Sequence, residues 1–176
     1  MVLPMTFAMW QAGSRTGLPL PWLSIIVLAT GFETRRMLWQ MQIEGRGGAT
    51  ILDRWGDEDP RAHLGITVPG FPNLFCLYGP GTNLAHGGSL IFHSECQMRY
   101  ITQCIEALID GGHRAMEPRQ DRYDDWHERT QAEIKTLVWS QPSIKHSFFK
   151  NAYGEIHGLS PWRLVDYWTW TREIDL

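Results

Sequence analysis

The sequence predicts an α/β fold built from two buried strands and a long helix. Two apolar runs, residues 23–28 and 73–78, are rich in β-branched or aromatic side chains and are followed by glycine, as expected of strands buried on both faces of a parallel sheet. A long amphipathic segment over residues 89–110 follows the second run. A strand, a glycine-containing loop and a helix in this order are typical of α/β sheets whose strand ends present backbone to a ligand.

The first part of the chain contains one of these strands. Residues 1–22 are predicted to form a loose leader, because no hydrophobic period is sustained there and glycines and prolines interrupt it. The strand at residues 23–28 follows, and Gly31 lets the chain turn sharply after it. A short helix is expected over residues 34–41. The acidic stretch over residues 53–59 is interpreted as a solvated loop and not as a metal site.

The second strand and the long helix are predicted next. Prolines introduce the strand at residues 73–78, and Gly79 closes it. The helix over residues 89–110 is followed by Gly111-Gly112, which suits a C-terminal cap. Its predicted buried face comprises Ile101, Cys104, Ile105, Leu108 and Ile109. Because a helix N-terminus carries unsatisfied N–H groups, we expect it to face an anion or a polarised carbonyl oxygen above the strand end.

The C-terminal third is predicted to be mostly helical. A helix over residues 118–139 has an expected buried side of Tyr123, Trp126, Thr130, Ile134, Leu137 and Val138. A hairpin over residues 148–156 is expected to turn at residues 151–154. The pair Ser160-Pro161 suits the N-cap and first turn of a last helix that ends near residue 171.

Composition excludes several classes of function. The net charge of -3 and the absence of a basic run interleaved with aromatics argue against nucleic-acid binding. The longest apolar run, residues 18–30, is shorter than the roughly 20 residues that span a bilayer. Three cysteines without a C-x-x-C pair indicate neither a disulfide framework nor a thiolate metal site. The expected location is the cytoplasm.

Several motifs together resemble one family. They are the stretches at residues 27–32 (VLATGF), 68–83 (VPGFPNLFCLYGPGTN) and 150–154 (KNAYG), then Pro161-Trp162 and 166–168 (DYW). In this order and at these distances they resemble the C-terminal part of flavin-containing and Baeyer-Villiger monooxygenases, most closely the type that acts on aryl ketones such as 4-hydroxyacetophenone. The resemblance covers the chain from about residue 25 to its end.

The resemblance implies a partial fold and a partial cofactor site. It implies the C-terminal third of an FAD/NAD(P)-binding Rossmann-like fold, with residues 23–112 as the return of the nucleotide-binding domain and 113–176 as a helical extension packed on it. Thr30 and Gly31 would lie near FAD and NADPH. The cofactor-edge segment, residues 79–84, would pass beside the flavin, and its matching positions are Gly79, Thr82, Asn83 and Leu84.

The sequence also departs from that family in ways that bear on activity. Both phosphate-binding G-x-G-x-x-G turns are missing, Ser24 stands where the family usually has Asp, and the family's F-x-G-x-x-x-H-x-x-x-W-P signature and its flavin-steadying arginine are absent. Since glycine turns supply much of dinucleotide affinity, the chain is expected to be an inactive fragment of a monooxygenase that oxidises ketones or soft heteroatoms. No catalytic residue is assigned.

Other interpretations remain open. The chain is alternatively a non-catalytic interaction module, in which a protein partner covers the incomplete sheet. A third alternative is an aromatic ligand module built on the C-terminal tryptophans. His93-Ser94-Glu95 matches the H-x-E of zinc deaminases, but no P-C-x-x-C follows, so no metal is expected. His86, beside the expected flavin edge, is more simply a solvent-exposed loop histidine.

Overall fold

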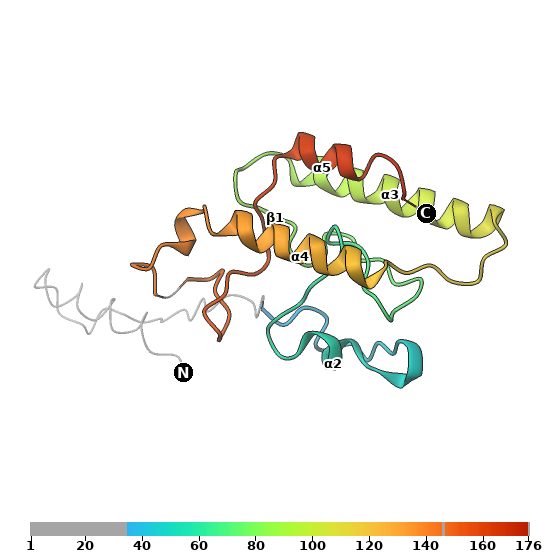
Figure 1. Cartoon of the computed structure of the whole chain (residues 1–176), viewed down its shortest axis with the longest axis horizontal. Coiled ribbons are helices and arrows are strands. Elements are labelled where there is room, and N and C mark those ends of the chain that lie inside the picture. The colour runs from blue at the N-terminus through green and yellow to red at the C-terminus, as the bar shows by residue number, and fades with distance from the viewer. Residues whose placement is uncertain (1–34, 146, 176) are drawn as a thin grey trace, which may run out of the picture. The chain divides into compact units, whose positions relative to one another are not determined.

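The computed structural model describes residues 35–145 and 147–175, which belong to the second of two units, Thr34–Leu176. The predictions for residues 1–34, including the strand at 23–28, lie outside the described residues. Figure 1 shows the described elements. In chain order they are η2 (Arg46–Gly48), α2 (Ile51–Trp55), β1 (Asn83–Leu84), α3 (Leu90–Asp110), α4 (Gln120–Ile134), η3 (Val138–Ser140), β2 (Leu159–Ser160) and α5 (Leu164–Trp170).

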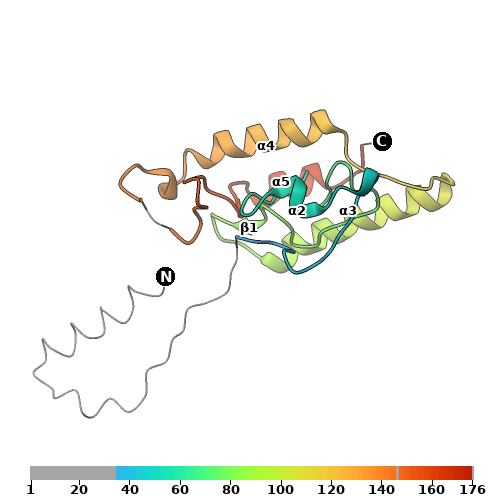
Figure 2. The same cartoon turned by 90° about the horizontal axis from the view of Figure 1, so that it is seen from below.

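The long helix is confirmed, but its buried face is rotated from the predicted one. Ser89 caps α3, because its side-chain oxygen accepts a hydrogen bond from Phe92 N–H. Ile101 and Cys104 are buried as predicted, whereas Ile105 and Ile109 are exposed. The buried residues of α3 are His93, Cys96, Gln97, Ile101 and Cys104. This face packs against α5, which runs beside α3 (Figure 1 and Figure 2). Tertiary contacts therefore select a face that includes two polar side chains.

The second helix is confirmed in place and is shorter than predicted. α4 ends at Ile134, and its buried residues are Tyr123, Trp126, Thr130 and Ile134, as expected. The chain then turns, since Thr136 and Leu137 N–H donate to Glu133 O and Ile134 O. Leu137 is buried after this turn. Val138 is exposed in η3, so its assignment to the buried side was wrong.

The predicted strand at residues 73–78 is absent from the structure. Asn73 (φ 61°) and Tyr78 (φ 54°) have left-handed backbone conformations that a strand does not contain. Phe75 makes only an isolated antiparallel bridge to Thr67. An apolar run forms a strand only beside neighbouring strands, and β1 with β2 is the one named strand pair within residues 35–145 and 147–175. The run is instead a chain of turns.

Two shorter predictions also fail. Residues 35–41 form bends and turns instead of a helix, with Leu38 at φ 59°. α2 extends through residues 53–55 of the stretch that was expected to be an acidic loop. The helix begins with a capping box: Asp53 N–H donates to Thr50 Oγ1, and the Asp53 carboxylate accepts from Thr50 N–H. The capping box therefore starts a helix in a segment whose many charged residues had predicted a loop.

The C-terminal segment is built differently from the prediction. The turn at residues 151–154 forms, but only one antiparallel bridge, Lys150 with Ile156, flanks it. Ser160 belongs to β2 and caps no helix, because its backbone pairs with Leu84 in a parallel ladder. α5 consequently begins later, after Arg163.

The largest core cluster lies where α3, α4 and α5 meet the loop before residue 67. It consists of Leu64, Ile66, Cys96, Ile101, Trp126 and Tyr167. Trp162, Trp168 and Trp170 pack against it while partly exposed, and the rings of Trp126 and Trp170 meet edge to face, with centroids 5.5 Å apart. The C-terminal tryptophans therefore have a structural role. Within the described residues no helix is both long and apolar enough to cross a membrane.

Candidate functional site

The cofactor-edge segment, residues 79–84, lies between the loop before residue 67 and α3. Gly79, Thr82, Asn83 and Leu84 are adjacent on this segment, whereas Thr30 and Gly31 lie outside the described residues. Thr82 is 1% exposed, and its hydroxyl donates to Gly79 O at 2.6 Å. The segment thus closes on itself through a buried side chain.

Glycine is required at two facing positions. A Cβ on Gly79 would lie 2.3 Å from Gly65 O, and a Cβ on Gly65 would lie 2.2 Å from Thr82 Cγ2. Real Cβ atoms do not approach other atoms this closely, so neither position accommodates a side chain without movement of the backbone or of Thr82. Close approach of the two loops, more than the end of a strand, explains why glycine stands at position 79.

α3 holds the start of the same segment. The Gln97 side chain is fully buried, and its Oε1 accepts a hydrogen bond from Tyr78 N–H at 2.7 Å. The Tyr78 hydroxyl donates to Asn83 Oδ1 at 3.2 Å. These bonds fix Tyr78 in its left-handed conformation, which an L-residue adopts only at an energetic cost. The segment is therefore anchored through Tyr78 and Asn83 by hydrogen bonds within the chain.

The other end of the segment is held by a parallel pair. Asn83 N–H donates to Gly158 O at 2.9 Å, and Ala85 N–H donates to Ser160 O at 3.1 Å. β1 and β2 pair in parallel with Asn83 opposite Leu159. β1 belongs to the predicted region 23–112 and β2 to the predicted region 113–176, so this ladder joins the two regions.

The N-terminus of α3 follows the cofactor-edge segment after a glycine pair. Gly87 and Gly88 have φ of 78° and 115°, and the first helical backbone bond runs from His93 N–H to Ser89 O. The amides of Leu90 and Ile91 precede that bond and carry the partial positive charge of the helix. His86, on the preceding loop, is exposed.

A buried polar group lies beneath this helix end. His93 is fully buried, both of its ring nitrogens lack a hydrogen-bond partner, and its ring lies on Tyr167 with centroids 3.9 Å apart. Burial lowers the pKa of His93 to about 4, so the imidazole is neutral at pH 7. The Tyr167 hydroxyl donates to Leu64 O at 2.6 Å, and burial raises the pKa of this phenol. These groups are packed in the core.

Other candidates for chemistry are unreactive here. Burial raises the pKa of the Cys76 thiol to about 11, which suits a small buried hydrophobe and not a nucleophile. Glu95 is exposed while His93 is buried, so the H-x-E pair does not converge. Among the residues that the structure describes, no group of three or more His, Cys, Asp or Glu side chains is placed to hold a metal ion.

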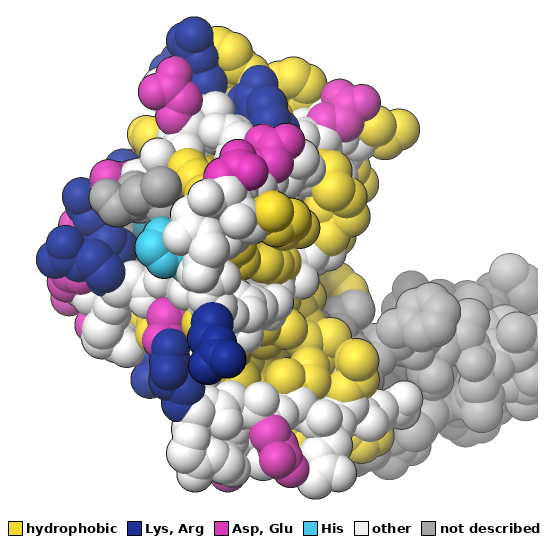
Figure 3. Space-filling view, turned by 90° about the vertical axis from the view of Figure 1, so that its right-hand side faces the viewer, with side chains coloured by type: hydrophobic (Ala, Val, Ile, Leu, Met, Phe, Trp, Pro, Cys, Tyr) yellow, Lys and Arg dark blue, Asp and Glu magenta, His cyan; other side chains and the backbone are white. Residues whose placement is uncertain are grey.

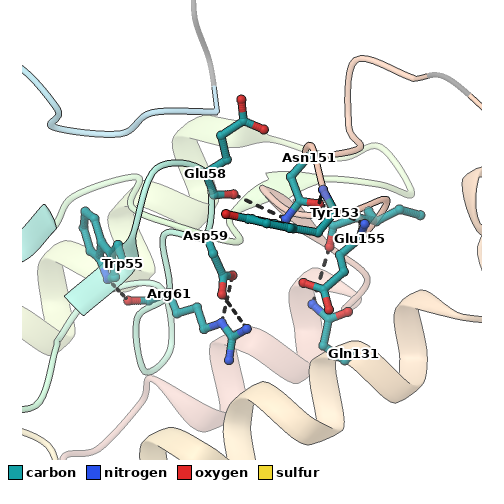
Figure 4. A network of polar contacts seen from close by, with 9 residues as sticks. Trp55, Glu58, Asp59, Arg61, Gln131, Asn151, Tyr153 and Glu155 are labelled. Atoms are coloured by element: carbon teal, nitrogen blue, oxygen red, sulfur yellow. Dashed lines mark hydrogen bonds and ion pairs between the residues drawn. The ribbon is translucent and has the colours of Figure 1, made fainter. Parts of the chain in front are cut away.

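A polar network that the sequence did not reveal ties the turn at residues 151–154 to the loop at 58–61 (Figure 4). Glu58 is buried, and its carboxylate accepts from Ala152 N–H at 2.7 Å. Asn151 Oδ1 accepts from both Tyr153 N–H and Glu155 N–H. Asp59 pairs with Arg61 at 2.5 Å. The expectation that this acidic stretch is simply solvated is wrong for Glu58, because a turn distant in sequence packs over it.

Two cavities bear on what the described residues can hold. A pocket of about 40 Å³ beside Pro80 and Gly81 has room for very few water molecules. A cleft of about 640 Å³ runs between the C-terminal half of α3, α4 and the last residues. No residue of the cofactor-edge segment lines that cleft. Of these two cavities the segment lines only the small one, through Pro80 and Gly81.

Several curated proteins are similar to this chain over most of its length. The chain is 41% identical over 152 residues to the monooxygenase y4iD of Sinorhizobium fredii, covering 86% of this chain and 23% of that protein. It is 35% identical over 147 residues to the FAD-binding monooxygenase ktnD of Aspergillus niger, covering 81% and 24%. A Baeyer-Villiger monooxygenase of Streptomyces coelicolor is 31% identical over 152 residues, covering 86% and 29%. The homologues of this chain are monooxygenases.

Solved structures agree with these relatives. The open crystal structure of cyclohexanone monooxygenase matches with a TM-score of 0.56 and 27% identity, covering 76% of this chain and 22% of that one. A steroid monooxygenase bound to NADP matches with a TM-score of 0.62 at 24% identity, covering 74% and 24%; at that identity the match concerns the fold alone. No protein-family model matches the chain. The chain spans about a quarter of the length of the curated relatives it matches.

Proposed function

We propose that this chain is the C-terminal part of an FAD- and NADPH-dependent monooxygenase of the Baeyer-Villiger type, and that it supplies one edge of the cofactor site without acting alone. The observation that carries the proposal is the cofactor-edge segment, whose Gly79 and Thr82 are locked against each other and against Gly65, just before α3 begins. The similarity of this chain to a quarter of FAD-binding and Baeyer-Villiger relatives supports it.

The described residues fit one edge of a flavin and no more. Reduced flavin carries negative charge at its pyrimidine edge, and the N-terminus of a 21-residue helix offers N–H groups and a partial positive charge to such an edge. When bound, the flavin would supply oxygen activation after reduction by NADPH. The chain's own contribution is to hold residues 79–84 and the amides of Leu90 and Ile91 in place. Thr30 and Gly31 would lie near both cofactors.

The finer parts of the proposal concern domains, location and substrate. Residues 1–22 would be a leader, 23–112 the return of the nucleotide-binding domain and 113–176 its extension. The proposed compartment is the cytoplasm, in keeping with three buried free thiols. The proposed substrates of the whole enzyme are small ketones, with aryl ketones such as 4-hydroxyacetophenone as the first class to assay. One matched structure is named for cyclohexanone.

The test measures cofactor retention with and without the remaining polypeptide. The purified chain is expected to be colourless and to leave NADPH unoxidised in the presence of FAD, because its sequence contains no G-x-G-x-x-G turn to hold the diphosphate. Fusing it to the portion of the Sinorhizobium fredii relative that lies outside the matched segment is expected to yield a yellow protein. Stoichiometric flavin on the chain alone, or a colourless fusion that is folded, would contradict the proposal.

A further inference from the structure

The outer face of α3 carries a stripe of exposed apolar side chains that the exposed Thr102 interrupts between Met98 and Ile105. It consists of Ile91, Met98, Ile105 and Ile109, which are 73%, 49%, 43% and 72% exposed. The spacings of seven, seven and four residues place all four side chains on one side of the helix. The 18 residue steps from Ile91 to Ile109 make the stripe about 27 Å long. Figure 3, which looks at the side where α3 ends, shows hydrophobic side chains gathered along one part of the surface and most charged side chains along another.

α3 leaves this apolar stripe exposed while it buries a face that contains polar side chains. α3 buries His93 and Gln97 completely, although burying a polar side chain gains less than burying isoleucine. Three side-chain nitrogens of this pair have no hydrogen-bond partner, which costs further free energy. A helix with a single covered side would bury its most apolar face. The observed orientation is therefore the one expected of a helix that is covered on both sides.

We propose that the stripe on α3 is the surface on which the remaining polypeptide of the oxygenase packs, the part that carries the dinucleotide-binding regions. This inference rests on the proposed function. In the relatives about three quarters of the length lies outside the segment that this chain matches. That length is ample to cover a stripe of four residues, whereas α5 covers only the opposite face.

Charges beside the stripe favour this occupant over a second copy of the chain. Glu95 and Glu106 are exposed on the same border of the stripe, and within the described part of the chain neither is in an ion pair. Arg99, the one Lys or Arg within α3, lies over the Trp168 ring, 5.6 Å from its centroid. In an antiparallel two-fold pairing centred on the stripe, Glu95 of one copy would face Glu106 of the other, and like charges repel. The partner surface is therefore expected to be apolar with flanking Lys or Arg.

The test measures binding of the full chain to the purified portion of the Sinorhizobium fredii relative that lies outside the matched segment. Isothermal titration calorimetry would give the affinity, and size-exclusion chromatography the state of the free chain. Met98→Glu and Ile105→Glu are each expected to weaken binding tenfold or more, since each places a charge in an apolar contact. Val138→Glu is the matched control, because Val138 is 52% exposed and lies in η3, off α3. It is expected to bind within about twofold of the wild type, as is the conservative variant Met98→Leu.

Circular dichroism checks that each variant is folded, which exposed positions should allow. Equal binding by the stripe variants, equal loss in Val138→Glu, no binding by the wild type, or a homodimer that Met98→Glu dissociates would each overturn the inference. Flavin absorbance of the complex separates this result from the proposed function. A stripe-dependent complex without flavin would contradict only the proposed function, and a flavin-bound complex insensitive to the stripe would contradict only the inference.

Discussion

Replacing Gly79 by alanine is expected to destabilise the chain by a specific steric mechanism. The added Cβ would lie 2.3 Å from Gly65 O and 2.6 Å from Cys76 Cβ. Ordinary contacts between such atoms are about 3.5 Å or longer, so the two loops must separate by about 1 Å. The first contact is a backbone atom, which cannot move aside by changing rotamer. The separation would also strain the hydrogen bond from Thr82 to Gly79 O.

The magnitude follows from two opposing terms. Overpacking of this kind costs about 1–3 kcal/mol, and the rigid backbone neighbour places Gly79→Ala at the upper end. Gly79 is not among the positive-φ glycines, so alanine regains about 0.5 kcal/mol by restricting the unfolded chain. The net expectation is a loss of about 2–3 kcal/mol in the free energy of unfolding. For a chain of this size that lowers Tm by roughly 5–10 °C.

Gly81→Ala is the control, because it introduces backbone strain without a steric clash. Gly81 has φ 73° and nothing within 4 Å of an added Cβ, so this variant is expected to lose only about 1 kcal/mol. Urea unfolding followed by tryptophan fluorescence gives both values, with unchanged m confirming that stability alone has altered. If Gly79→Ala costs no more than Gly81→Ala, the close contact with Gly65 does not constrain the cofactor-edge segment and the reasoning is refuted.

Three further predictions concern buried polar groups. Burial lowers the pKa of His93 to about 4, so between pH 6.5 and 4 the unfolded chain binds more protons, and the free energy of unfolding should fall by about 3 kcal/mol as the pH drops through that window. Tyr167→Phe leaves Leu64 O without its buried donor and should cost about 1–2 kcal/mol, measured by urea unfolding. Glu58→Ala removes the acceptor of Ala152 N–H and should cost about 1–3 kcal/mol, with faster amide exchange at residues 151–155.

Matched variants make each of these predictions refutable. His93→Leu should flatten the difference between pH 6.5 and 4, and an unchanged slope would show that His93 does not resist protonation. Tyr153→Phe, at a 70% exposed phenol, should change stability by less than 0.5 kcal/mol. Asp57→Ala, on an exposed neighbour of Glu58, should behave likewise. Equal losses in control and test variants would mean that the buried hydrogen bonds contribute nothing specific.

The elements that local signals define were predictable from the sequence. α3 and α4 have a sustained apolar period, and Ser89 caps α3, so both helices lie where the pattern placed them. The strand expected at residues 73–78 failed because a strand needs neighbours, which a local pattern does not report. The prediction of which face of α3 is buried was wrong for a related reason. The apolar character of Ile105 and Ile109 predicted that they are buried. Tertiary contacts with α5 instead bury the face that carries His93 and Gln97.

The cofactor-edge segment was predictable only as a stretch of sequence. The resemblance to monooxygenases named Gly79, Thr82, Asn83 and Leu84 together, and they are adjacent in the structure by connectivity. Their physical partners were not visible from the sequence. Gly65 is 14 residues away from Gly79, and nothing local relates the two before the loops are packed. The contact between Glu58 and the turn at residues 151–154 is likewise non-local, since 93 residues separate Asn151 from Glu58.

The way the cofactor-edge segment is held bears on how the whole site forms. Its shape depends on Gln97, on the Gly65 contact and on the pairing of β1 with β2, and all of these lie within residues 65–160. Preorganised backbone donors bind a ligand edge without a further ordering cost, which is the main advantage of such a segment. The contacts needed to shape this edge are therefore separable from those that would bind a diphosphate. Under the proposed function, assembly with the portion of the Sinorhizobium fredii relative that lies outside the matched segment should leave residues 79–84 unchanged, and amide exchange at these residues should be equally slow before and after assembly.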